Sequence, residues 1–128
     1  MIKNIIFDLG NVIIKCDNLS TMLNFTDNKE IVENLIKYIF KSEEWKLLDL
    51  GNITKEDAIL KIQNRVPKGY KSLIKEVIEN RTKYLKINKE TIEIAKKLKN
   101  IKYLCYLTCQ HIHMNILKIM NFLIYAME

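Results

Sequence analysis

The feature that most constrains this chain is a short apolar run near its N-terminus that stops at a carboxylate. Residues Asn4 to Leu9 read NIIFDL, and Gly10 and Asn11 follow as a turn signal. A continuous apolar run of this length is typical of a parallel strand buried on both faces. Asp8 lies at the C-terminal end of the run, where ligands bind in open α/β sheets. We therefore expect an α/β sheet with Asp8 at its ligand-binding edge.

Between Cys16 and Ile87 the apolar residues recur at helical spacing. Capping and turn residues bound four helical stretches in this segment. The expected helices are Asn28 to Phe40 with Asp27 as N-cap, Ser42 to Leu50 with Ser42 as N-cap and Gly51 as stop, a helix opened by a Thr54–Asp57 capping box, and Lys71 to Leu85 after the break at Pro67. Trp45 is expected in the core of this helical insert rather than in a ligand site.

After Asn88 the pattern returns to a helix followed by a strand. The expected elements are a helix capped by Asn88 and ending at Asn100, a strand from Ile101 to Leu107, and a last helix from His111 to Glu128. A helix that feeds a second apolar strand is a crossover unit, so the two strands are predicted to be parallel. The predicted organisation is a core of residues 1–15 and 87–128 with an all-helical cap of residues 16–86.

Charge and composition narrow the classes of partner. The chain has 128 residues and a net charge of +6, but its lysines alternate with glutamates between residues 68 and 99. That alternation indicates solvated helix faces, so we expect no nucleic-acid partner. The apolar stretch Ile116 to Ala126 contains Lys118 and Asn121 and is too short to span a bilayer, so we expect no membrane partner. Three cysteines without framework spacing indicate free thiols and a cytoplasmic protein.

The chemistry follows from residues at the ends of the two predicted strands. A carboxylate such as Asp8, placed before a glycine turn, is suited to nucleophilic attack on phosphorus. Because two anions repel, the site needs Mg²⁺ and hydrogen-bond donors. The Thr108 hydroxyl, the Cys109 backbone N–H and Asn11 are the expected phosphate-binding groups. Each residue taken alone equally suits an ordinary turn or helix cap, and only their combination favours a phosphoryl-transfer site.

This combination resembles a known family. FDLGNV is similar to the first motif of haloacid-dehalogenase-like (HAD) hydrolases, in the DxGxV branch of small-molecule phosphatases. Phe40 to Ala58 is similar to the helical cap of that branch, and the YLTC segment resembles the second motif. The resemblance implies a partial HAD/Rossmann-like core with an inserted cap, and a Mg²⁺-dependent phosphatase acting on a small phosphorylated metabolite. It further implies that Asp8 is the nucleophile and a metal ligand, and that the Gly10 main-chain carbonyl is a second ligand.

The chain also departs from the family pattern. Gly10 stands where most members carry an acid/base aspartate, and Cys109 stands where asparagine is usual. The third-motif lysine and the fourth-motif acidic pair find no match, because Lys118 comes too soon after Thr108. We therefore expect a C-terminally truncated member with an incomplete Mg²⁺ site and little or no activity. The alternative hypothesis is an inactive remnant, or a binding module that pairs as a homo-oligomer through open sheet edges.

One further cluster has metal-ligand residue types. Cys105, Cys109, His111 and His113 follow a C-x3-C-x-H-x-H spacing that matches no zinc-finger pattern. Histidines two residues apart point to different faces of a helix. A buried thiol with exposed histidines is the expected arrangement. The residues that choose a substrate cannot be identified in the helical cap.

Overall fold

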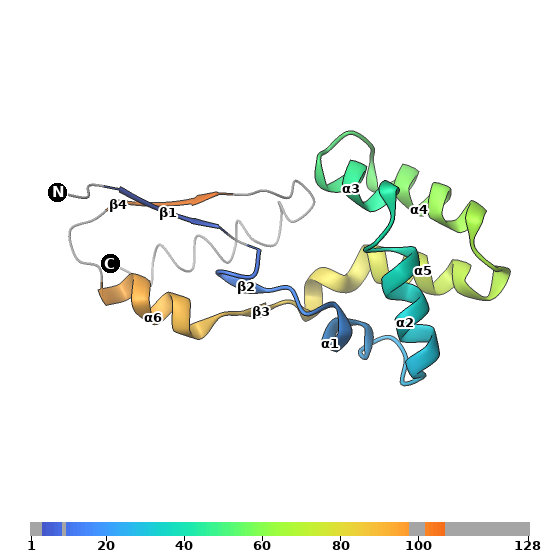
Figure 1. The fold of residues 1–128 in the computed structure, drawn as a ribbon, viewed down its shortest axis with the longest axis horizontal. Coiled ribbons are helices and arrows are strands. Elements are labelled where there is room, and N and C mark those ends of the chain that lie inside the picture. Colours follow the sequence, from blue (N-terminus) through green and yellow to red (C-terminus); the bar gives the residue numbers. More distant parts are fainter. Residues whose placement is uncertain (1–3, 9, 98–101, 107–128) are drawn as a thin grey trace. The chain divides into compact units, whose positions relative to one another are not determined.

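The computed structural model describes residues 4–8, 10–97 and 102–106. The described residues form a mixed α/β chain that is mostly helical. The chain divides into two compact units (Figure 1). The strand unit is Met1–Cys16 with Lys86–Glu128, and the helical unit is Asp17–Leu85. The sequence placed these boundaries at 15/16 and 86/87.

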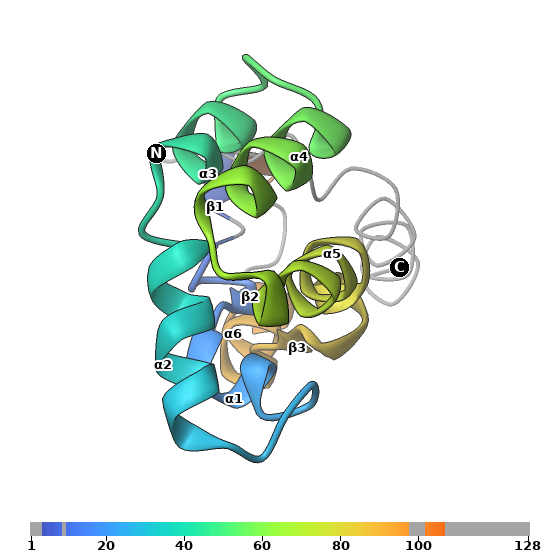
Figure 2. The same ribbon diagram turned by 90° about the vertical axis from the view of Figure 1, so that its right-hand side faces the viewer.

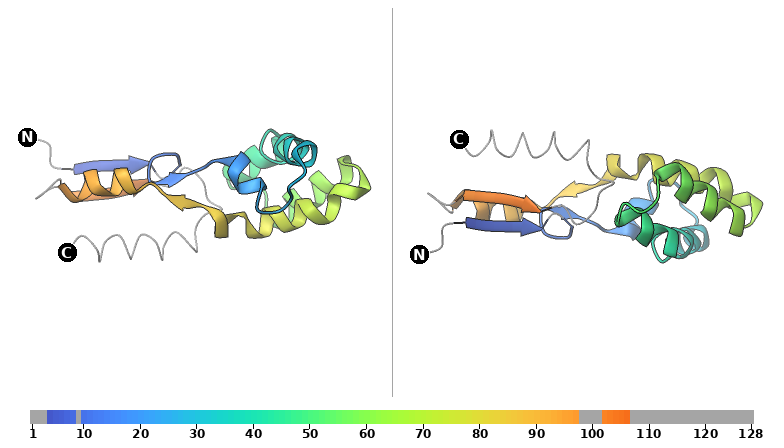
Figure 3. Two further views of the ribbon diagram at one scale, coloured as in Figure 1. Left: turned by 90° about the horizontal axis from the view of Figure 1, so that it is seen from below. Right: turned by 90° about the horizontal axis from the view of Figure 1, so that it is seen from above.

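The strand unit is organised around two parallel strands. Its described elements are β1 (Asn4–Asp8), β2 (Ile14–Lys15), β3 (Lys86–Ile87), α6 (Lys89–Lys97) and β4 (Lys102–Tyr106). β1 and β4 pair in parallel, from Asn4 opposite Lys102 to Asp8 opposite Tyr106. The two predicted strands and their parallel direction are thus confirmed. β2 and β3, which the sequence did not predict, pair antiparallel beside the covalent links to the helical unit (Figure 3).

The helical unit contains the four predicted helices and one more. Its elements are α1 (Asn18–Met22), α2 (Lys29–Tyr38), α3 (Glu43–Asp49), α4 (Lys55–Arg65), the 3-10 turn η1 (Lys68–Tyr70), α5 (Lys71–Asn80) and the 3-10 turn η2 (Arg81–Tyr84). Figure 2 shows these helices from a second side, and they pack around a common centre. Buried apolar side chains fill that centre: Met22, Val32, Leu35, Ile39, Trp45, Leu48, Ala58, Ile59, Ile62, Val66, Ile74, Val77 and Ile78.

Local capping explains where α3 and α4 begin and where α3 ends. The Ser42 hydroxyl accepts the Trp45 backbone N–H, and Thr54 and Asp57 form a reciprocal capping box. Gly51 follows α3 with a left-handed φ of 72°. Its N–H donates to the Leu48 carbonyl and the next N–H donates to the Leu47 carbonyl, which is the Schellman arrangement. The predicted caps Ser42 and Thr54 and the stop at Gly51 are confirmed.

Two predicted boundaries are wrong. The N-cap of α2 is Asn28 rather than Asp27, because the Asn28 side chain accepts the backbone N–H groups of Glu30 and Ile31. The helix predicted from Lys71 to Leu85 ends at Asn80 and continues as the 3-10 turn η2. A single tighter turn at a helix end is not visible in an apolar periodicity.

The η2 turn brings a cation into the aromatic part of the core. The Arg81 guanidinium lies 4.7 Å from the centroid of the Trp45 ring and 5.2 Å from that of Phe40. Arg81 is 8% exposed and Trp45 9% exposed. A desolvated guanidinium is attracted to the faces of aromatic rings. Trp45 is therefore a core residue, as predicted.

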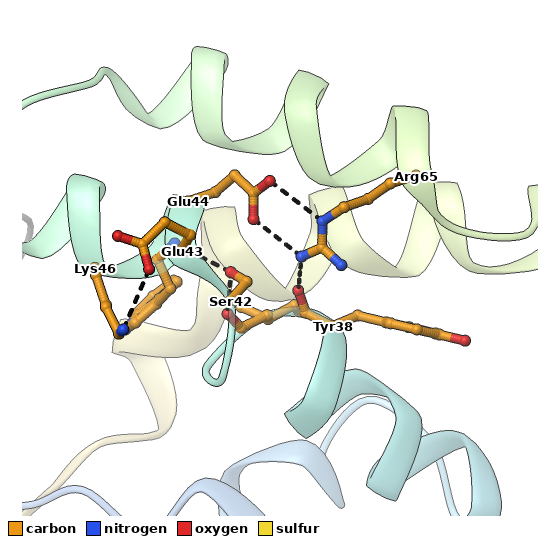
Figure 4. Close-up of polar contacts among 8 residues, drawn as sticks. Tyr38, Ser42, Glu43, Glu44, Lys46 and Arg65 are labelled. Carbon is orange, nitrogen blue, oxygen red and sulfur yellow. Dashed lines mark hydrogen bonds and ion pairs between the residues drawn. The ribbon is translucent and has the colours of Figure 1, made fainter.

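Arg65 joins three helices of this unit (Figure 4). Its guanidinium donates to both carboxylate oxygens of Glu44 on α3, at 3.2 and 3.0 Å. The same group donates to the Tyr38 carbonyl at the end of α2, at 2.7 Å. A bidentate carboxylate contact is stronger and more directional than a single ion pair. Arg65 therefore ties the C-terminus of α4 to the start of α3 and the end of α2.

This contact predicts a pH dependence of stability. Burial raises the pKa of Glu44, but hydrogen bonds from its own backbone and from Arg65 outweigh burial, so the pKa lies below the ordinary 4.5. The folded chain thus holds the carboxylate ionised more readily than the unfolded chain. The resulting stabilisation is complete above pH 4.5 and is lost as pH falls through the lowered pKa.

We expect Glu44→Gln to lower the free energy of unfolding by about 0.5–1 kcal/mol at pH 7, because the pair is partly exposed. The difference from the wild-type chain should shrink towards zero below pH 4. Urea unfolding between pH 3 and pH 7 measures it, with Glu43→Gln as the control because Glu43 pairs with Lys46 at the surface. An equal loss at every pH would contradict a role for the Glu44 charge.

Candidate functional site

Asp8 is the last residue of β1 and lies opposite Tyr106, the last residue of β4. Because the strands are parallel, Asp8 and Tyr106 end at the same edge of the sheet. The Asp8 side chain is exposed. An exposed carboxylate at the C-terminal end of a parallel strand is accessible to a ligand. The predicted phosphate-binding residues Thr108 and Cys109 lie outside the described residues.

The loop after Asp8 is closed by its own hydrogen bonds. The Asn11 N–H donates to the Ile14 carbonyl at 2.8 Å, and the Asn11 side-chain oxygen accepts the Cys16 N–H at 3.1 Å. Asn11 has a φ of 58°, in the left-handed region that asparagine tolerates better than most residues. Its side chain is exposed, and its NH₂ group donates to none of the described residues. That group can donate to an anion in the predicted phosphate-binding role.

Gly10 has no steric need to be glycine. Its φ is not left-handed, and a Cβ added to it would meet nothing within 4 Å. The glycine therefore leaves open space two residues after Asp8, where a larger side chain can be accommodated. Within the described loop, the Gly10 carbonyl is not among the hydrogen-bond acceptors. It can act as an oxygen ligand, as the sequence predicts.

Both Mg²⁺ ligands that the sequence predicts, Asp8 and the Gly10 carbonyl, lie among the described residues. The Asp8 carboxylate and the Gly10 carbonyl are two hard oxygen donors separated by one residue. Mg²⁺ takes about six oxygen ligands in nearly octahedral geometry. Across residues 4–8, 10–97 and 102–106, no group of three His, Cys, Asp or Glu side chains could hold a metal ion. Further ligands would have to be phosphate oxygens, waters or residues outside this part.

The zinc-like cluster falls mostly outside the described residues. Cys109, His111 and His113 lie there, and of Cys105 the structure describes only its place in β4. Cys16 is a half-buried free thiol, as expected, and its sulfur lies 3.7 Å from the Ile14 carbonyl oxygen.

The sequence did not reveal how the second half of the loop is held. Ile13 and Ile14 are buried, and the N-terminal end of α6 donates hydrogen bonds to the carbonyls of Val12 and Ile13. Asn88 occupies the N-cap position of α6, as predicted, but its side chain contacts the loop rather than capping the helix. No sequence signal connects residues so far apart along one chain.

Comparisons with protein-family models, curated proteins and solved structures each found no match. Among the described helices, none combines the length and the apolar character needed to cross a bilayer.

We predict that substitutions of Asn11 separate its two roles in the loop. Asn11→Gly removes the acceptor for the Cys16 N–H and keeps the left-handed φ. Asn11→Ala removes the same acceptor and also strains the backbone, because an L-residue at this φ costs about 1–2 kcal/mol. Part of that difference from the glycine variant is offset, because glycine loses more chain entropy on folding than alanine does. Asn11→Asp keeps the acceptor and the tolerance of this φ.

Hydrogen exchange of the Cys16 amide and urea unfolding together test this prediction. Exchange should be faster in the glycine and alanine variants and unchanged in the aspartate variant. The alanine variant should be the least stable of the three. An alanine variant as stable as the glycine variant would show that the left-handed conformation is not required.

Proposed function

We propose that this chain belongs to the HAD-like hydrolase superfamily, in the DxGxV branch, and that its chemistry is phosphoryl transfer from a small phosphorylated metabolite to Asp8. The observation that carries the proposal is the place of Asp8. It is exposed, it ends a strand paired in parallel with β4, and it precedes a loop closed by Asn11. A separate helical unit is inserted after that loop, in the order that the family's cap would occupy.

The distribution of charge supports an anionic substrate. The strand unit contains nine of the 21 basic residues but only four of the 15 acidic residues, whereas the helical unit is nearly balanced. The excess positive charge therefore belongs to the unit that carries Asp8. A positive potential around a site raises the local concentration of anions and their rate of association.

In the proposed reaction a carboxylate oxygen of Asp8 attacks phosphorus, and the bond between phosphorus and the ester oxygen breaks. The leaving alkoxide takes its proton from a donor other than residue 10, which carries no carboxyl group. Water then hydrolyses the aspartyl-phosphate, which releases inorganic phosphate and regenerates Asp8. Asn11, Thr108 and Cys109 are the proposed phosphate-binding groups.

The proposal extends to a cofactor and a compartment. Asp8 and the Gly10 carbonyl are the residues that would hold Mg²⁺, and the metal would neutralise charge between the carboxylate and the phosphate. A cytoplasmic location accords with the half-buried free thiol of Cys16.

The test compares the wild-type chain with Asp8→Asn and with Asp27→Asn as a matched control. Asp27 is an exposed aspartate that caps no helix. With an aryl phosphate and a panel of phosphorylated metabolites in the presence of Mg²⁺, the wild-type chain should show slow turnover above the rate without protein, and Asp8→Asn should fall to that background rate. Asp27→Asn should match the wild-type chain. A hydroxylamine-sensitive phosphate should map to Asp8 by mass spectrometry. Equal rates for wild type and Asp8→Asn would rule out catalysis by Asp8.

A second candidate function is a binding module that pairs through its sheet edges. Among the described residues the parallel sheet contains only β1 and β4. Open strand edges present unpaired backbone groups that can pair with another chain. This function predicts a homodimer or larger species in size-exclusion chromatography with light scattering, and dissociation on dilution. A monomer at every concentration would contradict it.

A further inference from the structure

Two residues at the start of α6 hold the loop that follows Asp8. The Asn88 side-chain NH₂ donates to the Val12 carbonyl at 3.0 Å, and the Thr91 hydroxyl donates to the same carbonyl at 2.7 Å. The Asn88 backbone N–H donates to the Ile13 carbonyl at 2.7 Å. All four residues belong to the strand unit, although 76 and 79 residues separate the side-chain partners. Three hydrogen bonds therefore converge on one peptide segment.

The orientation of Asn88 shows that the loop, and not the helix, is its partner. An asparagine at an N-cap normally accepts an N–H from the first turn of its helix. Here the Asn88 side-chain oxygen is buried and has no hydrogen-bond partner among the described residues. Rotating the amide by 180° would place that oxygen against the Val12 carbonyl, and two acceptors repel. The contact with Val12 thus determines the orientation, at the expense of a buried acceptor that is left unpaired.

Thr91 adds a second donor from the first turn of α6. It is the third residue of the helix and is half-buried. Its hydroxyl donates outside its own helix, to Val12, rather than to a nearby backbone carbonyl of α6. The Val12 carbonyl therefore has both of its lone pairs occupied by side chains of one helix end.

These contacts bear on Asp8 because they hold the other end of its loop. β1 pairing with β4 holds the backbone at Asp8, and α6 holds the backbone at Val12, four residues later. Between them, Asn11 bonds to Ile14 and Cys16.

A catalytic group that is displaced by about 1 Å can lose about a hundredfold in rate. We propose that Asn88 and Thr91 are positioning residues that hold the Gly10–Ile13 segment in register with Asp8. The role in catalysis rests on the proposed function, whereas the role in ordering the loop does not.

The experiment uses matched variants of Thr91. Thr91→Val removes the hydroxyl at nearly constant shape, and Thr91→Ser keeps it. Thr21→Val is the control, because the Thr21 hydroxyl also donates to a carbonyl, that of Asp17, at 2.7 Å, but in the helical unit. Asn88→Ala removes the second donor. Thermal unfolding first establishes a temperature at which every variant is folded.

The first readout is the alkylation rate of Cys16 by iodoacetamide, mapped by mass spectrometry to separate it from Cys105 and Cys109. The Cys16 N–H bonds to Asn11, so a loosened loop exposes this thiol. Thr91→Val and Asn88→Ala should alkylate at least about fivefold faster than the wild-type chain, since the loss of a half-buried hydrogen bond shifts local opening by about that factor. Thr91→Ser and Thr21→Val should match the wild type. An unchanged rate in Thr91→Val, or no rescue by serine, would overturn the proposed ordering of the loop.

The second readout is turnover of the aryl phosphate. Thr91→Val should lower kcat by about 10- to 100-fold with little change in KM, and Thr91→Ser should restore it. Thr21→Val should leave both parameters unchanged. Equal kcat in wild type and Thr91→Val would overturn the catalytic role. A wild-type chain without turnover would overturn that role together with the proposed function, whereas the alkylation rates separately uphold or overturn the ordering of the loop.

Discussion

The strand unit depends on the parallel pairing of β1 with β4. Parallel strands cannot be joined by a short hairpin, and here the helical unit and α6 both lie in the connection between them. Closing so long a connection costs chain entropy, which the backbone hydrogen bonds and the apolar strands must offset. The same pairing places Asp8 at the C-terminal edge of the sheet. Without it, Asp8 would be an ordinary residue before a turn.

The helical unit rests on a separate set of interactions. Its apolar core, the Arg65 contacts with α2 and α3, and the contact of the Arg81 guanidinium with the Phe40 and Trp45 rings all lie within residues 17–85. Both guanidinium groups contact residues of the helical unit itself. Asp8 belongs to the strand unit and is exposed at the end of β1. Stability and the proposed chemistry therefore involve different parts of the chain.

The loop from Gly10 to Cys16 follows Asp8 and is held by several hydrogen bonds, so it bears on both stability and the proposed chemistry. Asn11 shapes it through a left-handed φ and the bond to Cys16, and the start of α6 holds its carbonyls. Gly10 forms an isolated bridge with Ile14, and a side chain in its place would meet no other atom within 4 Å. The loop is thus held by hydrogen bonds at Asn11 and at Val12, and it has open space beside Gly10. Groups held in this way would suit the proposed phosphate chemistry, because preorganised donors stabilise developing charge without reorganising.

The amino-acid sequence by itself determined the features that depend on neighbouring residues. The two apolar strands, the caps at Ser42 and Thr54 and the stop at Gly51 were predictable, because each rests on groups within a few positions. The sequence could not decide between Asp27 and Asn28, because both residue types are good N-caps and they are adjacent. In the structure the cap is Asn28. Only the tertiary structure decided the β2–β3 pair, the 3-10 turn that brings Arg81 into the core, and the partners of Asn88 and Thr91. These contacts join residues tens of positions apart, and whether such residues meet depends on how the whole chain packs.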